Sequence, residues 1–188
     1  MDDSAVAALV AAAAAGEQGA WDALVDRFSG LVWAVVRSYR LQSSDASDVF
    51  QTTWLRAVER LAALREPERI GGWLATTARR EALLTLRRGK RERPTDDTSL
   101  DAADDAAPAP GEPLESEERA ATLWRCFEQG SQRCQQLLRV LLADPPLPYI
   151  DVAAALGMPV GSIGPTRRRC LEQLRSYVLQ AGVDADQS

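Results

Sequence analysis

Residues 149–175 have the sequence YIDVAAALGMPVGSIGPTRRRCLEQLR, and this stretch decides how the C-terminal part of the chain folds. A short apolar helix is expected first, Gly157 supplies a tight turn, and Pro159 prevents the helix from continuing. A longer helix with helically spaced apolar residues follows. The pattern predicts a helix-turn-helix. The expected inward residues are Ile150, Val152, Ala153 and Leu156 in the first helix and Val160, Ile163, Leu171, Leu174 and Val178 in the second.

The second helix of this pair carries polar and basic residues on its expected outer face, which are Ser162, Thr166, Arg167, Arg168 and Arg169. Short polar side chains near a helix start approach base edges, and arginines bond to guanine edges or phosphates. We therefore expect the second helix to lie in the major groove of DNA, with Ser162 as its N-cap. The alternative is an ordinary pair of helices whose arginines only face solvent.

The composition limits the remaining choices. The chain has 188 residues, 46% of them hydrophobic, which suits two small helical domains. It has no histidine, and its three cysteines lack Cys-x-x-Cys spacing, so neither a zinc site nor a cofactor is expected. We expect the cysteines to be reduced thiols in a cytoplasmic protein. The Ala-rich residues 5–15 are too short for a membrane anchor and lack the basic start of a signal peptide.

Charge is segregated along the chain, although the net charge is −5. Residues 92–118 contain ten acidic residues and one arginine, whereas residues 56–91 contain ten basic residues and four glutamates. The local sign therefore matters more than the total for the choice of partner.

Apolar spacing predicts three helices in the N-terminal part, over about residues 18–40, 43–61 and from 73 onward. In the second, the expected inward residues are Val49, Phe50, Thr53, Trp54, Val58 and Leu61. The proline-containing, acidic residues 92–114 have no apolar face and are expected to form a flexible linker. The prediction is an all-α protein with an N-terminal domain over 1–91, this linker, and a C-terminal helix-turn-helix domain over 115–188.

One segment of the second helix carries a specific motif, Asp45-Ala46-Ser47-Asp48-Val49-Phe50-Gln51-Thr52-Thr53-Trp54. With the acidic linker and the helix-turn-helix after it, the chain resembles bacterial RNA polymerase sigma factors of the extracytoplasmic-function type over about residues 15–180. In that family this helix docks on the clamp helices of the polymerase large subunit. The resemblance implies polymerase contacts by Asp45, Asp48, Gln51, Trp54 and Arg56.

The next helix contains a second family motif, Trp73-Leu74-Ala75-Thr76-Thr77-Ala78-Arg79-Arg80. In the family this helix meets the promoter minus-10 element, and the loop before it, here residues 65–72, holds a base flipped from the non-template strand. The resemblance implies minus-10 contacts by Arg65, Arg69, Trp73, Arg79, Arg80, Arg87 and Arg88. Arg80 and Leu84 replace the Asn and Asp of the family, which leaves the base preference open. In the family the second helix of the helix-turn-helix meets the minus-35 element, which implies minus-35 contacts by Ser162, Thr166, Arg167, Arg168 and Arg169. The resemblance also implies that the linker runs through the polymerase cleft.

The resemblance implies core RNA polymerase and promoter DNA as partners, leaves open an anti-sigma factor, and implies no membrane and no small-molecule substrate. The function expected is promoter recognition, duplex opening and transcription initiation. The alternatives are a helix-turn-helix regulator that works without polymerase, and a helical interaction scaffold. An enzyme is not expected, because no catalytic arrangement of Asp, Glu, Cys or Ser is recognisable.

Overall fold

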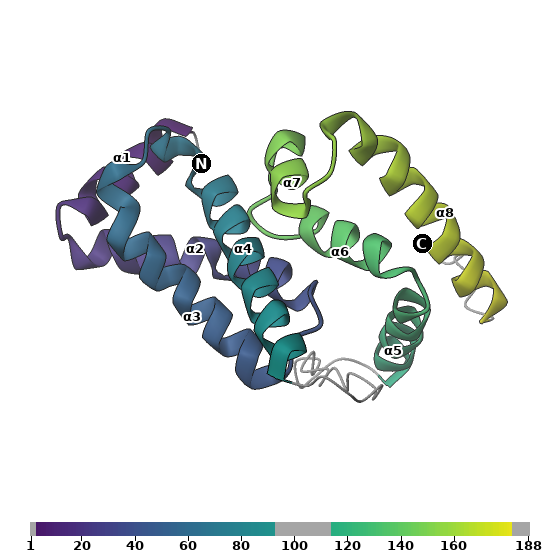
Figure 1. Ribbon diagram of the computed structural model, residues 1–188. Coiled ribbons are helices and arrows are strands. Elements are labelled where there is room, and N and C mark those ends of the chain that lie inside the picture. The colour runs from purple at the N-terminus through teal and green to yellow at the C-terminus, as the bar shows by residue number, and fades with distance from the viewer. Residues whose placement is uncertain (1–2, 93–113, 182–188) are drawn as a thin grey trace.

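A computed structural model describes the backbone of residues 3–92 and 114–181 and the side chains of residues 4–89 and 119–181. Within these ranges the chain is helical and contains no strand, as the sequence predicts (Figure 1). Most of the expected acidic linker lies outside the described residues. The elements are α1 (Asp3–Ala14), α2 (Gln18–Arg37), α3 (Ser43–Arg60), η1 (Leu61–Ala63), η2 (Pro67–Arg69), α4 (Ile70–Glu92), α5 (Leu114–Glu128), α6 (Gln132–Leu141), α7 (Tyr149–Leu156), η3 (Val160–Ser162) and α8 (Ile163–Gln180).

Helices α1 to α4 form the N-terminal half around a core that α2 crosses. The apolar stripe of α2 is buried, including Leu24, Leu31 and Val35. The short helix α1 packs on α2 and on η2, with Val6 and Val10 buried. None of the described helices is long and apolar enough to cross a membrane.

Helix α4 begins at Ile70, three residues earlier than the sequence predicts, so Gly71 and Gly72 lie in its first turn. A Cβ at position 71 would lie 3.1 Å from Phe28 and 3.3 Å from Leu147, and one at position 72 would lie 2.5 Å from the carboxyl carbon of Asp151. The two glycines therefore permit close packing on this face of α4 instead of interrupting the helix.

Helices α5 to α8 form the C-terminal half, in which α7, η3 and α8 make the expected helix-turn-helix. Gly157 ends α7 with φ of 62°, a left-handed conformation that favours glycine. Ser162 precedes α8 without capping it, because its hydroxyl donates to the Pro159 carbonyl at 2.7 Å. Ser162 thus occupies the N-cap position expected from the sequence, but its side chain makes no capping hydrogen bond.

The rotation of α8 differs from the prediction. Ile163, Thr166 and Cys170 are its buried residues, whereas Leu171 is 42% exposed. Spacing of three and four residues puts these three on one helical face, and Leu171 falls just outside it. The expected inward positions of Ile150, Val160 and Val58 are also wrong, since each side chain is exposed.

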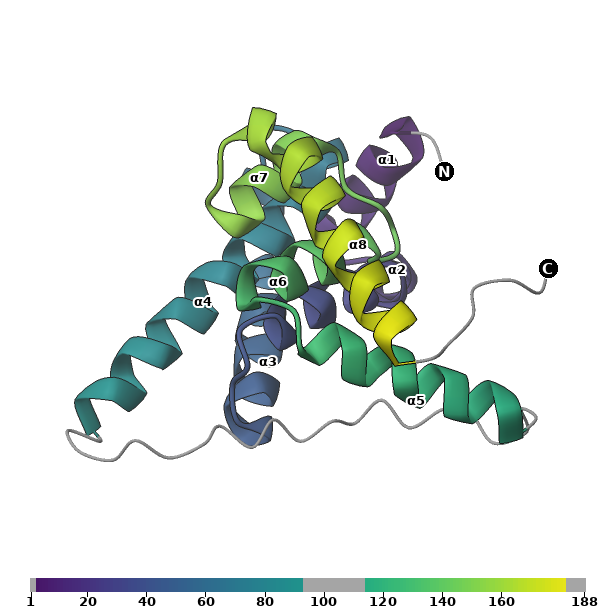
Figure 2. The same cartoon turned by 90° about the vertical axis from the view of Figure 1, so that its right-hand side faces the viewer.

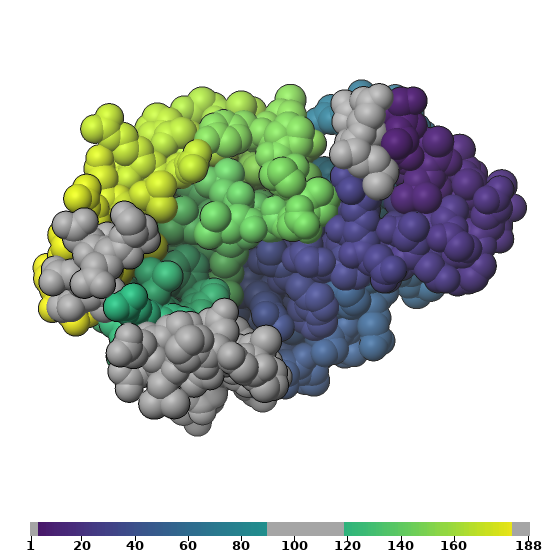
Figure 3. Space-filling model, turned by 180° about the vertical axis from the view of Figure 1, so that it is seen from behind, coloured from purple at the N-terminus to yellow at the C-terminus, as the bar shows by residue number. Residues whose placement is uncertain are grey.

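The two halves share one hydrophobic core. Helix α4 packs against α3 and α2 on one side and against α7 on the other, as Figures 1 and 2 show. The C-terminal helices lie directly on the N-terminal half in the space-filling view (Figure 3). Apolar side chains of both halves, such as Leu74 and Val152, belong to the same buried cluster. A polar contact also joins the halves, because Arg40 donates to the amide oxygen of Gln135 at 2.8 Å.

The cysteines differ from the expectation of reduced thiols. Cys134 of α6 and Cys170 of α8 form a disulfide with a Cα–Cα distance of 5.3 Å, and Cys126 is a buried free thiol. The bond joins α8 to α6. Sequence spacing gave no sign of it, because the two residues are 36 positions apart and meet only through the packing of the two helices.

Candidate nucleic-acid interface

A cationic groove lies between the C-terminal end of α3, η1 and the exposed face of α4. Its volume is about 560 Å³. The lining residues are Arg56, Arg60, Ala63, Leu64, Trp73, Thr77, Arg80, Glu81, Leu84 and Arg88. Three residues of the expected minus-10 set, Trp73, Arg80 and Arg88, thus line one groove. Arg60 belongs to it as well and was missed, because the sequence patterns treat the two helices separately.

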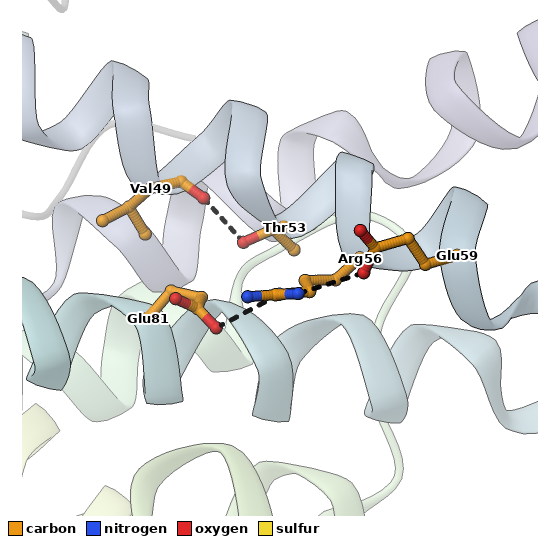
Figure 4. A network of polar contacts seen from close by, with 5 residues as sticks. All are labelled: Val49, Thr53, Arg56, Glu59 and Glu81. Carbon is orange, nitrogen blue, oxygen red and sulfur yellow. Dashed lines mark hydrogen bonds and ion pairs between the residues drawn. The ribbon is translucent and has the colours of Figure 1, made fainter.

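Arg56 links the two walls of this groove (Figure 4). Its guanidinium lies 3.0 Å from Glu59 on α3 and 3.9 Å from Glu81 on α4. Behind it, the hydroxyl of the buried Thr53 donates to the Val49 carbonyl at 2.7 Å. We expected Arg56 among the polymerase contacts, but the structure places it at the groove.

The other minus-10 arginines do not line this groove. Arg65 and Arg87 are exposed, whereas Arg69 and Arg79 face the C-terminal half. Arg69 donates a hydrogen bond to the carboxylate of Asp151 on α7, which raises the pKa of Arg69 above its ordinary value. Asp151 itself is buried, with 6% of its surface exposed.

Arg79 lies beside the end of α7, where its guanidinium occupies the space that a side chain at Gly157 would need. It also interacts with Tyr39, in the turn after α2. Burial raises the pKa of Tyr39, and the charge and hydrogen bond of Arg79 partly offset this rise. The expected minus-10 set is therefore divided between the groove, the surface and the contact with α7.

The expected polymerase residues lie on α3, but not all face outward. Asp48 and Gln51 are exposed and Asp45 is half-buried. Trp54 is 8% exposed and packs edge-on against Trp21 at 5.9 Å between ring centroids. Its direct contact with a partner is therefore not supported, because aromatic neighbours cover the ring.

Two apolar side chains extend the exposed face of α3. Leu55 is 57% exposed and Val58 is 60% exposed. With Asp48 and Gln51 they follow the three- and four-residue spacing of one helical face. The sequence analysis missed Leu55 and wrongly placed Val58 inside. The sequence did contain a signal for this surface, namely an apolar residue, Leu55, at helical spacing from the acidic Asp48 and the amide Gln51.

The arginines of α8 surround a shallow groove of about 440 Å³ beside α7, lined by Tyr149, Gly164, Arg167, Arg168, Leu171, Glu172 and Arg175. Arg168 pairs with Glu172 at 2.9 Å, a contact that raises the pKa of Arg168. Arg167 donates to the Tyr149 hydroxyl at 3.3 Å. Arg175 was missed by the sequence analysis.

The two uncharged members of the expected minus-35 set, Thr166 and Ser162, are less exposed to solvent than its arginines. Thr166 is buried, with 9% of its surface exposed, and accepts a long hydrogen bond of 3.5 Å from Arg169. Ser162 is half-buried. The orientation predicted for Thr166 is therefore wrong, because α8 turns this residue toward its own core. Among the described residues no cluster of His, Cys, Asp or Glu is suited to hold a metal ion.

A comparison with known protein families relates the segment that forms the α3–α4 groove to one family. Residues 24–92, which include most of α2, all of α3 and α4 and the whole groove lining, match sigma-70 region 2. No curated protein matches the sequence.

Two solved structures are similar to the whole chain. CnrH in complex with the cytosolic domain of CnrY has a TM-score of 0.59 and 22% identity, covering 94% of this chain and 98% of that one. The sigma factor RpoE of Bartonella quintana in complex with the anti-sigma factor NepR has a TM-score of 0.64 and 21% identity, covering 87% and 98%. At these identities the likeness concerns the fold.

Proposed function

We propose that this chain, whose residues 24–92 match sigma-70 region 2, is a sigma factor of the extracytoplasmic-function type that recruits core RNA polymerase to promoters and helps to open the duplex. The observation that carries this proposal is the cationic groove between α3 and α4. It lies within the matched segment and combines the indole of Trp73 with the guanidinium groups of Arg56, Arg60, Arg80 and Arg88. An aromatic ring with surrounding arginines is the combination that binds unpaired nucleotides.

Promoter contact is assigned to two surfaces. In the minus-10 region, Trp73, Arg80 and Arg88 contact the unpaired strand, while Arg65 and Arg87 contact phosphates. In the minus-35 region, Arg167, Arg168 and Arg169 of α8 contact the duplex. This division accords with domains over 1–91 and 115–188 and a linker over 92–114.

Polymerase contact is assigned to the exposed face of α3, with Asp48 and Gln51 as polar contacts and Leu55 and Val58 as the apolar centre. Apolar side chains at the centre of a patch with polar groups around them are typical of protein interfaces. Core RNA polymerase and promoter DNA are then the main partners.

Regulation and location follow from the same proposal. The RpoE structure contains an anti-sigma factor, and we propose a partner of that kind for this chain. It would act in the cytoplasm, where core polymerase transcribes, and would have no catalytic activity of its own.

The test is transcription in vitro with purified core polymerase and the full chain. The double variant Arg80→Ala with Arg88→Ala should lose most promoter-dependent transcript, because it removes two cations from the groove. Arg133→Ala provides the matched control, since Arg133 is exposed on α6 outside both DNA surfaces. Sequence-specific promoter binding by the chain alone, unchanged by core polymerase, would instead favour a regulator that works without polymerase.

A further inference from the structure

The α3–α4 groove contains donor and acceptor groups in a combination that distinguishes among the four bases. Its 560 Å³ falls within the ordinary range of small-molecule sites. Ala63, Leu64 and Leu84 contribute apolar surface, and Trp73 contributes an aromatic face for a planar ligand. The polar groups are the four arginines, Thr77 and Glu81.

Glu81 is the only carboxylate in this lining. Its side chain is 17% exposed and forms an ion pair with Arg56, whose Nε lies 3.9 Å from the carboxylate oxygen (Figure 4). That distance is beyond hydrogen-bond range, and Arg56 makes its shorter contact with Glu59. The ion pair therefore leaves acceptor capacity on Glu81 for a ligand in the groove.

The arginines supply the complementary property. A guanidinium only donates hydrogen bonds, and its planar fork matches two neighbouring acceptors. Arg80 and Arg88 of α4 line the same groove as Glu81. The groove thus offers one partly buried carboxylate as an acceptor and several forked donors.

Guanine is the base that matches both properties. Its N1–H and N2 amino group are adjacent donors for one carboxylate, and its O6 and N7 are adjacent acceptors for an arginine. Adenine presents a donor beside an acceptor on each of these edges. Cytosine and thymine each have a single donor group on the pairing edge. A carboxylate therefore bonds less completely to these three bases.

We infer that this groove selects guanine, with Glu81 accepting from the pairing edge, Arg80 donating to O6 and N7, and Trp73 stacking on the ring. The inference rests on the proposed function, because it names the base that the unpaired promoter strand places in the groove. A free guanine nucleotide offers the same chemistry and is a second source of the ligand.

The first experiment is transcription with core polymerase from a promoter library that is randomised across the minus-10 element. Wild-type chain should enrich guanine at one unpaired position. Glu81→Gln should move that preference to adenine, because an amide donates to N1 and accepts from the N6 amino group. The change in relative yield should be roughly tenfold, as for loss of one bidentate base contact.

The control is Glu59→Gln, which removes the same charge on the other side of Arg56 but lies outside the groove lining. It should retain the guanine preference. Transcription without a guanine preference, or an unchanged preference in Glu81→Gln, would overturn the inference and leave the sigma-factor assignment intact.

The second experiment measures binding of the full chain to fluorescent oligothymidylates that carry one central guanine, adenine or cytosine. The guanine-containing strand should bind most tightly to the unchanged chain, and the adenine-containing strand should bind most tightly to Glu81→Gln. Equal binding of all strands would overturn the inference, whether or not the chain supports transcription. A lack of transcription with core polymerase would count against the proposed function instead. Guanosine monophosphate provides a competition test. If it displaced the guanine of the strand from the groove while the other DNA contacts stayed intact, the groove would be assigned to the free nucleotide and its assignment to DNA would be overturned.

Discussion

Replacing Gly72 by alanine should separate α4 from α7. A Cβ at this position would lie 2.5 Å from Cγ of Asp151, and 2.7 and 2.8 Å from its two carboxylate oxygens, whereas ordinary contacts begin near 3.4 Å. Asp151 is buried and bonded to Arg69. The carboxylate therefore has little room to move, and α7 must shift instead.

The size of the effect follows from two opposing contributions. Overpacking of a close contact costs about 1–3 kcal/mol. Alanine in a helix is favoured over glycine by roughly 0.5–1 kcal/mol. We therefore expect Gly72→Ala to lower the free energy of unfolding by up to about 2.5 kcal/mol.

Gly89 on the same helix provides the control, because a Cβ there meets no atom within 4 Å. Gly89→Ala should raise stability slightly, through helix propensity alone. Urea unfolding followed by circular dichroism would measure both variants, and the double variant Gly72→Ala with Asp151→Ala should recover part of the loss. If Gly72→Ala were as stable as Gly89→Ala, the close approach of α4 and α7 would be refuted.

Three further predictions concern other parts of the molecule. Reduction of the disulfide, or Cys134→Ser, should lower stability by about 3–4 kcal/mol, as expected for a loop of this length. Thermal unfolding with and without dithiothreitol measures this: Cys126→Ser should keep the reductant dependence of the unchanged chain, whereas Cys134→Ser should lose it. Leu55→Ser with Val58→Ser should weaken core-polymerase binding about tenfold or more without destabilising the chain, and equal affinity in a pull-down titration would count against the α3 surface. The pKa of Tyr39 is raised in the folded state. The neutral Tyr39 hydroxyl therefore contributes fully to stability below about pH 10, and this contribution is lost as the pH rises through the folded-state pKa. Tyr39→Phe should reduce the alkaline loss of stability, which unfolding measurements across that pH range would detect.

The sequence predicted the helices well where apolar spacing was regular. The stripe in α2 and the turn at Gly157 are confirmed, because each depends on local pattern or backbone conformation. The start of α4 was predicted wrongly, since Gly71 and Gly72 resemble a break until the close packing of Asp151 and Leu147 is known.

The candidate site was less predictable than the fold. Thr166 and Leu171 lie on opposite sides of the helical face centred near Ile163 and Cys170, so the rotation of α8 about its axis decides which of the two is buried. The pairing of Cys134 with Cys170 and the participation of Arg60 in the groove depend on contacts between separate helices. One-dimensional spacing contains no information about such contacts.

The core shared by both halves has a calorimetric consequence. Any partner that separates α7 from α4 must expose part of the apolar cluster that both halves share, to which the fully buried Val152, Ala155 and Leu74 belong. Hydration of that surface contributes a positive heat-capacity change, opposite in sign to the burial of new surface against the partner. Two partners with equal contact areas would thus differ in the heat-capacity change of binding. A partner that leaves the halves together would give the full negative change, and a partner that separates them would give a less negative change.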